Sequence, residues 1–233
     1  MQYGHGVKNF GSTPVITPPA GDTLVITESD LTTTTNYPVQ IGRFFNSGEI
    51  ANFPSVKIDG VSQTTQAWPT QRWPNGSVRH CIMSFHIPTM QSGASKTISF
   101  ENKPNQTSFP LSQAQMLAAS FDFDMSIQFN FGTTTQTVSA RQMLTDGNYS
   151  VWFSGPVATS IQLADHSTSR VYDVGSDVNR SVRVIFDATF WPLTNQVDIL
   201  ACVEITNYEN KEYNQLAKQW TSSIGEWFTK SQY

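Results

Sequence analysis

Charge is scarce in this sequence, and the scarcity excludes several classes of protein. Of the 233 residues, 14% are Asp, Glu, Lys or Arg, and the formal net charge is -4. No basic face is available to neutralise a run of phosphates, so we expect no nucleic-acid partner. The longest apolar runs are far shorter than the roughly 20 residues that span a bilayer, and no apolar signal core follows Met1. We therefore expect a soluble chain with no membrane partner and no N-terminal signal peptide.

Cysteine is almost absent, and the familiar catalytic motifs are missing. Cys81 and Cys202 are the only cysteines, and we expect two buried thiols rather than a disulfide. The sequence has no Gly-x-Ser-x-Gly elbow, no phosphate-binding glycine loop and no Cys-His pairing. His80 and His86 would lie about 20 Å apart on a straight strand, too far to share a metal ion. We therefore expect no metal, no cofactor and no catalytic residue, and hence no enzyme.

Polar positions are filled by Thr, Ser, Asn and Gln, a usage that favours strands and turns over helices. The segment "SVKIDGVSQT" predicts a hairpin, because Asp59-Gly60 can supply the positive φ angles of a two-residue turn. In "FDFDMSIQFNF" every odd position from 121 to 131 is apolar, which predicts one long strand with a wet face. Asp122 and Asp124 would project from that face about 7 Å apart, nominally a glycosidase spacing. A wet face offers neither a cleft nor a raised pKa, so we expect only a solvated acidic surface.

The chain divides into four regions by composition and periodicity. Residues 1–22 form a glycine- and proline-containing arm, and the polar, proline-containing stretch after residue 100 separates two β domains. The fold class predicted is all-β: a small β-barrel over 23–104 and an antiparallel β-sandwich over 105–208. One short helix is expected in "LSQAQMLAAS". The C-terminal segment 209–233 has the spacing of an amphipathic helix.

Two alternating segments, "SVRVIFDATF" and "QVDILACVEI", predict a hairpin closed by "WPLTN". The apolar faces coincide most simply when Phe190 pairs with Val197. Cys202 then lies away from Cys81, whose strand belongs to the other predicted domain. The same register pairs Phe186 with Ala201, Val184 with Val203, Arg183 with Glu204 and Ile185 with Cys202.

The stretch "WPNGSVRH", residues 73–80, predicts a turn that feeds a strand. Pro74 fixes φ, and Asn75-Gly76 tolerates the backbone of a turn. Arg79 is expected at the rim of the barrel or beside a carboxylate. On the following strand we expect one apolar face and one mixed face, the first made of Cys81, Met83, Phe85 and Ile87 and the second of His80, Ile82, Ser84 and His86.

Three Trp-Pro pairs, at Trp68, Trp73 and Trp191, suit either of two roles. A following proline holds the indole rigidly, which reduces the entropy lost when a sugar stacks on it. Tryptophans at strand ends also plug the ends of barrels. If carbohydrate binds here, the candidate residues are Trp68, Trp73, Arg72 and Arg79.

Several of these segments resemble a known family. "IGRFFNSGEI", Gln66 and "RWPNGSVRHCIMSF" resemble the N-terminal RIFT-type barrel of the fungal exo-rhamnogalacturonan lyases and their bacterial YetA-like relatives. "VWFSGPVATSIQLAD", "VYDVG" and "ATFWPLTNQVDILACVEI" are similar to the central β-sandwich of the same proteins, so the matches span about residues 37–205. The sequence departs from the family at Ala51, Asn75 and His80, where the family usually has Pro, Asp and an aromatic residue. The α/α toroid of the family lyases has no counterpart, so the resemblance implies the scaffold and not the lyase chemistry.

Two β domains without catalytic machinery suggest a structural or interaction module. The leading hypothesis is a virion or surface-fibre component, such as the anchoring portion of a phage tail protein, on a virion or extracellular surface. Its partners would be other protein subunits, in a homo-oligomer or a larger assembly. The alternative is a pair of carbohydrate-associated accessory domains of a polysaccharide lyase, with a glycan as partner. A free-standing glycan hydrolase or lyase ranks last.

Overall fold

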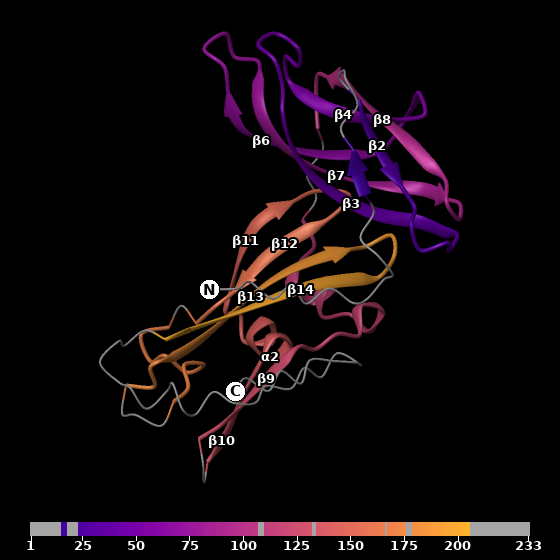
Figure 1. The fold of residues 1–233 in the computed structure, drawn as a ribbon. Helices are drawn as coiled ribbons and strands as arrows, with labels where there is room; N and C mark the ends of the chain where they lie inside the picture. Colours follow the sequence, from indigo (N-terminus) through magenta and orange to yellow (C-terminus); the bar gives the residue numbers. More distant parts are fainter. Residues whose placement is uncertain are drawn as a thin grey trace.

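The computed structural model describes residues 15–17, 23–106, 110–131, 134–165, 167–175 and 179–205. Antiparallel β-sheets make up most of these residues, and the helices are short, so the all-β expectation is confirmed. Figure 1 shows two β units placed end to end, with strands β2 to β8 in one unit and β9 to β14 in the other. We call them the N-terminal unit and the C-terminal unit.

The N-terminal unit consists of two sheets around one apolar core. The faces predicted for the strand after the "WPNGSVRH" turn are confirmed, because Cys81, Met83, Phe85 and Ile87 all lie in this core. The first sheet has the order β1(Val15–Thr17), β2(Leu24–Thr27), β8(Ser95–Lys103), β4(Phe53–Ile58), β5(Val61–Ser62). The second has the order β3(Thr34–Phe44), β7(Val78–Met90), β6(Thr65–Arg72).

These two sheets do not close into a barrel within the described residues. Where β4 passes β6, the Val56 N–H donates to the hydroxyl of Thr65 at 2.9 Å. Farther along, β6 loses regular register with β7, its partner in the same sheet, between Pro69 and Arg72. Proline has no N–H to give to a ladder, and a bulge ends regular pairing. Among the described residues β4 and β6 do not pair as neighbouring strands, so the two sheets stay separate.

The predicted Asp59-Gly60 hairpin is confirmed. Strand β4 pairs with β5 through Ile58 and Val61, and the two turn residues have φ angles of 50° and 84°. Positive φ at both central residues is the signature of a type I′ turn. The Asp59 carboxylate also accepts hydrogen bonds from Lys96 Nζ at 2.8 Å and from the Thr97 N–H at 3.0 Å, which tie the turn to β8.

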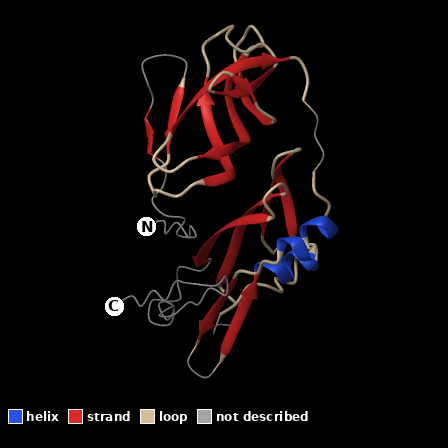
Figure 2. Cartoon of the chain, turned by 90° about the vertical axis from the view of Figure 1, so that its right-hand side faces the viewer, coloured by secondary structure: helices blue, strands red, loops and turns tan. Residues whose placement is uncertain are grey.

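The C-terminal unit packs a four-stranded sheet against a hairpin and short helices. Figure 2 shows the helices gathered on one side of the sheet. Phe186 and Phe190 are fully buried between these layers. The sheet order is β11(Tyr149–Ser154), β12(Thr159–Leu163), β13(Val182–Trp191), β14(Gln196–Ile205). The covering layer contains β9(Ser126–Asn130), β10(Thr135–Ser139), α1(Gln113–Met116), the 3-10 turn Ala119–Phe121 and α2(Ala140–Thr145).

Every predicted pair of the β13–β14 hairpin is confirmed, from Phe190–Val197 to Arg183–Glu204. The ionic partner of Arg183 is nevertheless a different residue. Its guanidinium lies 3.2 Å from the carboxylate of Asp173, whose side chain is only 1% exposed. Arg170 contacts the same carboxylate at 2.5 Å. The register of a sheet is set by the matching of apolar faces, which the sequence pattern shows. The position of Asp173 is not predicted by that pattern, because Asp173 lies in a loop.

The predicted long strand over 121–131 is wrong in extent, although its alternation of burial is correct. Only Ser126–Asn130 forms a strand, whereas Phe121 ends a 3-10 turn. Phe121 and Phe123 are buried because both meet the ring of Phe190 edge to face. A period of two therefore reports here which side chains reach the core, and not the backbone conformation.

Asp124 is consequently not part of a solvated strand face. Its carboxylate accepts hydrogen bonds from the Ser139 hydroxyl at 2.8 Å and from the Arg141 N–H at 3.2 Å, at the start of α2. The expected helix in "LSQAQMLAAS" is confirmed as α1, with a capping box between Ser112 and Gln115.

Two predictions fall mostly outside the described residues. Of the arm at 1–22, the structure describes Val15–Thr17, which pairs with β2 as strand β1. The predicted C-terminal helix lies entirely outside the described part.

The two units meet at a junction that combines buried polar and aromatic contacts. Gln66 of β6 is fully buried, and its Oε1 atom accepts hydrogen bonds from the N–H groups of Val157 and Ala158 at 3.0 and 2.9 Å. Trp68 packs against Phe153, with ring centroids 5.5 Å apart. His86 meets Trp191 edge to face at 5.7 Å. The mixed face of β7 and its neighbour β6 is therefore the face that the C-terminal unit covers.

Candidate functional site

The "WPNGSVRH" stretch forms a tight turn, as the sequence predicts. The Gly76 N–H donates to the carbonyl of Trp73 at 2.8 Å, and Gly76 adopts a φ of 86°. The Asn75 side chain accepts from the N–H and the hydroxyl of Ser77 and donates to the Ser47 hydroxyl at 3.0 Å. The asparagine thus connects the turn to the preceding loop.

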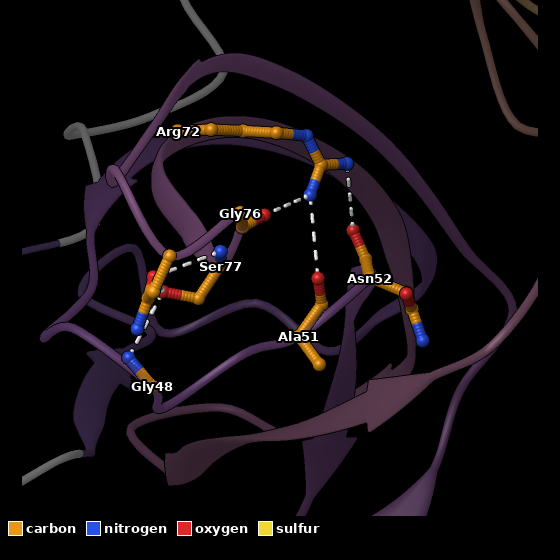
Figure 3. Close-up of a pocket in the computed structure, with 7 residues that line it drawn as sticks. Gly48, Ala51, Asn52, Arg72, Gly76 and Ser77 are labelled. Atoms are coloured by element: carbon orange, nitrogen blue, oxygen red, sulfur yellow. Dashed lines mark hydrogen bonds between the residues drawn. The ribbon is translucent and has the colours of Figure 1, made fainter.

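An open hollow of about 610 Å³ lies beside this turn (Figure 3). The guanidinium of Arg72 reaches across it and donates to the carbonyls of Gly76, Asn52 and Ala51 at 2.8, 3.1 and 3.3 Å. The Arg72 side chain therefore joins the turn to the loop at 51–52 through its hydrogen bonds. The lining residues are Gly48, Ala51, Asn52, Arg72, Asn75, Gly76 and Ser77.

Trp73 and Arg79 form a stacked pair near the hollow. The Arg79 guanidinium carbon lies 4.9 Å from the centre of the Trp73 ring, a cation–π arrangement. The Trp73 Nε1–H donates to the carbonyl of Phe45 at 3.0 Å. The guanidinium therefore covers one face of the indole. Arg79 is exposed, and it lies over an aromatic ring where we expected the barrel rim or a carboxylate.

Trp68 lies in a different place, so the four candidate residues do not form one constellation. Its ring meets Trp152 at 5.2 Å and Phe153 at 5.5 Å, at the junction between the units. Trp191 of the third Trp-Pro pair is buried, and its Nε1–H donates to Asp198 at 2.7 Å. Arg72, Trp73 and Arg79 gather at the turn.

Two buried carboxylates organise the loop between β12 and β13. The Asp173 carboxylate forms ion pairs with Arg170 and Arg183. Asp165 accepts from the Ser167 N–H and hydroxyl and from the Tyr172 N–H. Burial acts to raise the pKa of Asp165, but these hydrogen bonds outweigh it and hold the pKa below its ordinary value. Asp165 is thus held ionised by groups of its own loop.

Metal-binding clusters and a disulfide are not found in the described part of the chain. No group of three or more His, Cys, Asp or Glu residues comes together there in a way that could hold a metal ion. Cys81 and Cys202 are both unpaired thiols, the first buried and the second half-buried. Burial raises the pKa of the Cys81 thiol to about 12, which keeps it protonated and unreactive at neutral pH. None of the helices described is long and apolar enough to cross a membrane.

Sequence reasoning missed the polar junction and the exposed ring of Trp152. Gln66 and Ser84 occupy positions that a binary pattern assigns to solvent, but the C-terminal unit buries them. One sequence signal was available for Trp152, because an exposed position in a strand rarely needs so large an apolar side chain.

The chain was compared with protein-family models, with curated proteins and with solved structures, and none of the three comparisons found a match.

Proposed function

We propose that this chain is a non-catalytic structural or interaction module, a virion or surface-fibre component of the phage-tail type. It works with other protein subunits, in a homo-oligomer or a larger assembly on a virion or extracellular surface. The observation that carries the proposal is the edge strand β14. It is ten residues long, and β13 is its only strand partner within the described residues.

An edge strand of this kind is a ready template for another chain. It presents a row of backbone donors and acceptors, and strand addition satisfies them. Leu200 and Ile205 on β14 are 40% and 39% exposed, so a neighbouring strand would gain apolar contacts as well as hydrogen bonds.

The junction between the units supports the same role. Gln66 fixes the loop at 157–158 through two hydrogen bonds, and Trp68 and His86 add ring contacts. A module that transmits position or load between subunits needs two units that keep a fixed geometry. Buried hydrogen bonds supply that better than an apolar contact alone, because they hold only in one arrangement.

A charge placed on β14 tests the proposal. We expect Leu200→Lys to lower the native mass toward that of a single chain, because a lysine on an edge strand opposes strand addition. The matched control is Leu193→Lys in the β13–β14 turn, where the leucine is 59% exposed. Size-exclusion chromatography with light scattering measures both. Equal masses for the two variants and the unmodified chain would exclude β14 as the contact.

The second candidate function is that of carbohydrate-associated accessory domains. The observation that favours it is the ring of Trp152, which is 55% exposed and lies against Trp68. An exposed indole held by a second aromatic side chain is a suitable platform for the apolar face of a sugar.

A further inference from the structure

Four aromatic side chains form a row on the outer face of the sheet β3-β7-β6, next to the junction. Phe44 and His80 are cross-strand partners with ring centroids 4.6 Å apart. Trp68 and Trp152 meet edge to face at 5.2 Å. The outer member of each pair reaches solvent, because Phe44 is 67% exposed and Trp152 is 55% exposed. We call these four residues the ring row.

The pairing of the strands brings the two ring pairs onto one face. Trp68 lies opposite Ile82, and Phe44 lies opposite His80. Ile82 and His80 are two positions apart on β7, so their side chains share a face. One such step is about 7 Å along the strand and neighbouring strands lie about 4.8 Å apart, which puts the Cα atoms of Trp68 and His80 roughly 8 Å apart. The ring row is therefore longer than a single sugar ring.

The rings are held in place by the protein before any ligand binds. The hydroxyl of Thr70 is hydrogen-bonded to His80 Nδ1. Gly42 leaves room for the same imidazole, since a Cβ there would lie 3.2 Å from His80 Nε2. Trp68 is supported from beneath by Phe153. A surface that is already ordered loses little entropy on binding.

The chemistry around the ring row is mainly polar. Arg72, opposite Val78 at the end of β6, is the one cation at an outward position of the three strands, and its guanidinium donates to the backbone carbonyls of the nearby turn and loop. The other outward positions carry no carboxylate or ammonium group, and Ile82 is the only aliphatic side chain among those that are not fully buried. Protein-binding surfaces commonly use arginine, and an acidic glycan would need cationic partners. A ligand with flat apolar faces and hydroxyl groups fits this surface best. The residues beside the ring row that are not fully buried are Gln40, Gly42, Thr70, Gln71 and Ile82.

We propose that the ring row binds a neutral oligosaccharide. The apolar faces of successive sugars stack on the exposed rings of Trp152 and Phe44, and the amide of Gln71, which is opposite His80 in register, bonds to their hydroxyls. This inference rests on the carbohydrate-associated alternative above and names its ligand class and surface. It does not require that β14 mediate assembly.

Calorimetric titration of the full chain with neutral hexasaccharides tests the inference. The probes are gluco-, manno-, xylo- and galacto-hexaose, and hexagalacturonate serves as the charged counterpart. We expect at least one neutral probe to bind, equally well at low and high salt because no ion pair is involved. Phe44→Ala and Trp152→Ala should each lower the affinity about tenfold, since a stacked ring contributes on the order of one decade.

Two control variants keep the result interpretable, and circular dichroism checks the fold of each. Phe44→Tyr keeps the ring and should keep the affinity, and Leu31→Ala removes an apolar side chain that is 76% exposed elsewhere and should have no effect. The absence of binding to every neutral probe at millimolar concentration would overturn the inference, as would salt-sensitive binding of hexagalacturonate alone. A fall in native mass on Trp152→Ala would also overturn it, by making the ring row a subunit contact. The native mass of the unmodified chain reports separately on the assembly proposal.

Discussion

The Oε1 atom of Gln66 accepts a hydrogen bond from the Ala158 N–H at 2.9 Å, and this contact joins residues 92 positions apart in the chain. Both groups are buried, and the neighbouring Val157 N–H donates to the same oxygen. Gly155 makes the approach possible, because a Cβ there would lie 2.5 Å from Gln66 Cδ. The absence of a side chain at Gly155 therefore leaves room for the Gln66 amide to reach the loop at 157–158.

Removal of this glutamine should destabilise the fold. Gln66→Ala leaves two buried N–H groups without a partner, and we expect a loss of about 2–4 kcal/mol in the free energy of unfolding. The matched control is Gln162→Ala, where the amide is exposed and bonds to Asp187; a loss below about 1 kcal/mol is expected there. Urea denaturation measures both, and equal losses would show that the junction is not a structural contact.

A double-mutant cycle tests the role of the glycine. Gly155→Ala should cost about 1–3 kcal/mol because its new methyl group displaces the Gln66 amide. In the Gln66→Ala background the methyl group has room. The double variant should therefore lose less unfolding free energy than the sum of the losses in the two single variants. Simple additivity would mean that the added methyl group is accommodated elsewhere.

Stability should fall with acid through His86. Burial holds the pKa of this imidazole below its ordinary value of 6.5, and its Nε2 atom is buried without a hydrogen-bond partner among the described residues. As the pH falls below 6.5, the unfolded chain takes up a proton before the folded chain does. The stabilisation that is present above pH 6.5 is therefore lost progressively as the pH falls from 6.5 to the lower pKa of the folded state. His86→Leu should reduce the difference in unfolding free energy between about pH 7.5 and about pH 5.5; an unchanged difference would place the titration elsewhere.

Asp173 should matter far more than Glu204, although both face Arg183. Asp173→Ala leaves two arginines without their buried carboxylate, and we expect a loss of about 2–4 kcal/mol. Glu204 is an exposed cross-strand neighbour, and Glu204→Ala should cost less than about 1 kcal/mol. Thermal and urea unfolding of the two variants compare them. A larger effect at Glu204 would contradict the assignment of Asp173 as the partner.

Substitution of Gly60 in the Asp59-Gly60 turn should destabilise the protein through backbone conformation alone, without a steric clash. Nothing lies within 4 Å of a Cβ built on Gly60, but its φ is 84°. Gly60→Ala should therefore cost about 1–2 kcal/mol from conformation alone. Gly60→Asn should cost less, because asparagine tolerates positive φ. Equal stability of the alanine variant and the unmodified chain would mean that the turn changes its type.

The sequence predicted the parts of the fold that depend on turn chemistry and on the alternation of apolar residues. The Asp59-Gly60 turn and the register from Phe190–Val197 onward follow from turn chemistry and from the need to match apolar faces. The backbone between Phe121 and Asp124 did not follow, because contacts with Phe190 and the start of α2 override strand pairing there. The burial of Gln66 could not be predicted, because a polar residue on an outward strand face gives the same sequence pattern whether water or the other unit covers it.

The candidate site shows the same limit. The turn at 73–77 was predicted from Pro74 and Gly76, but the sequence does not show that Arg72 uses its donors on backbone carbonyls. It also does not show that the guanidinium of Arg79 covers Trp73. Both contacts join residues through tertiary folding, and they shift the candidate sugar platform from the turn to the ring row.

Sedimentation equilibrium of the unmodified chain over a wide concentration range tests the central claim, that this chain is an assembly module, most directly. We expect a defined mass above that of a single chain, lowered by Leu200→Lys and unchanged by Leu193→Lys. A single-chain mass at every concentration would contradict it.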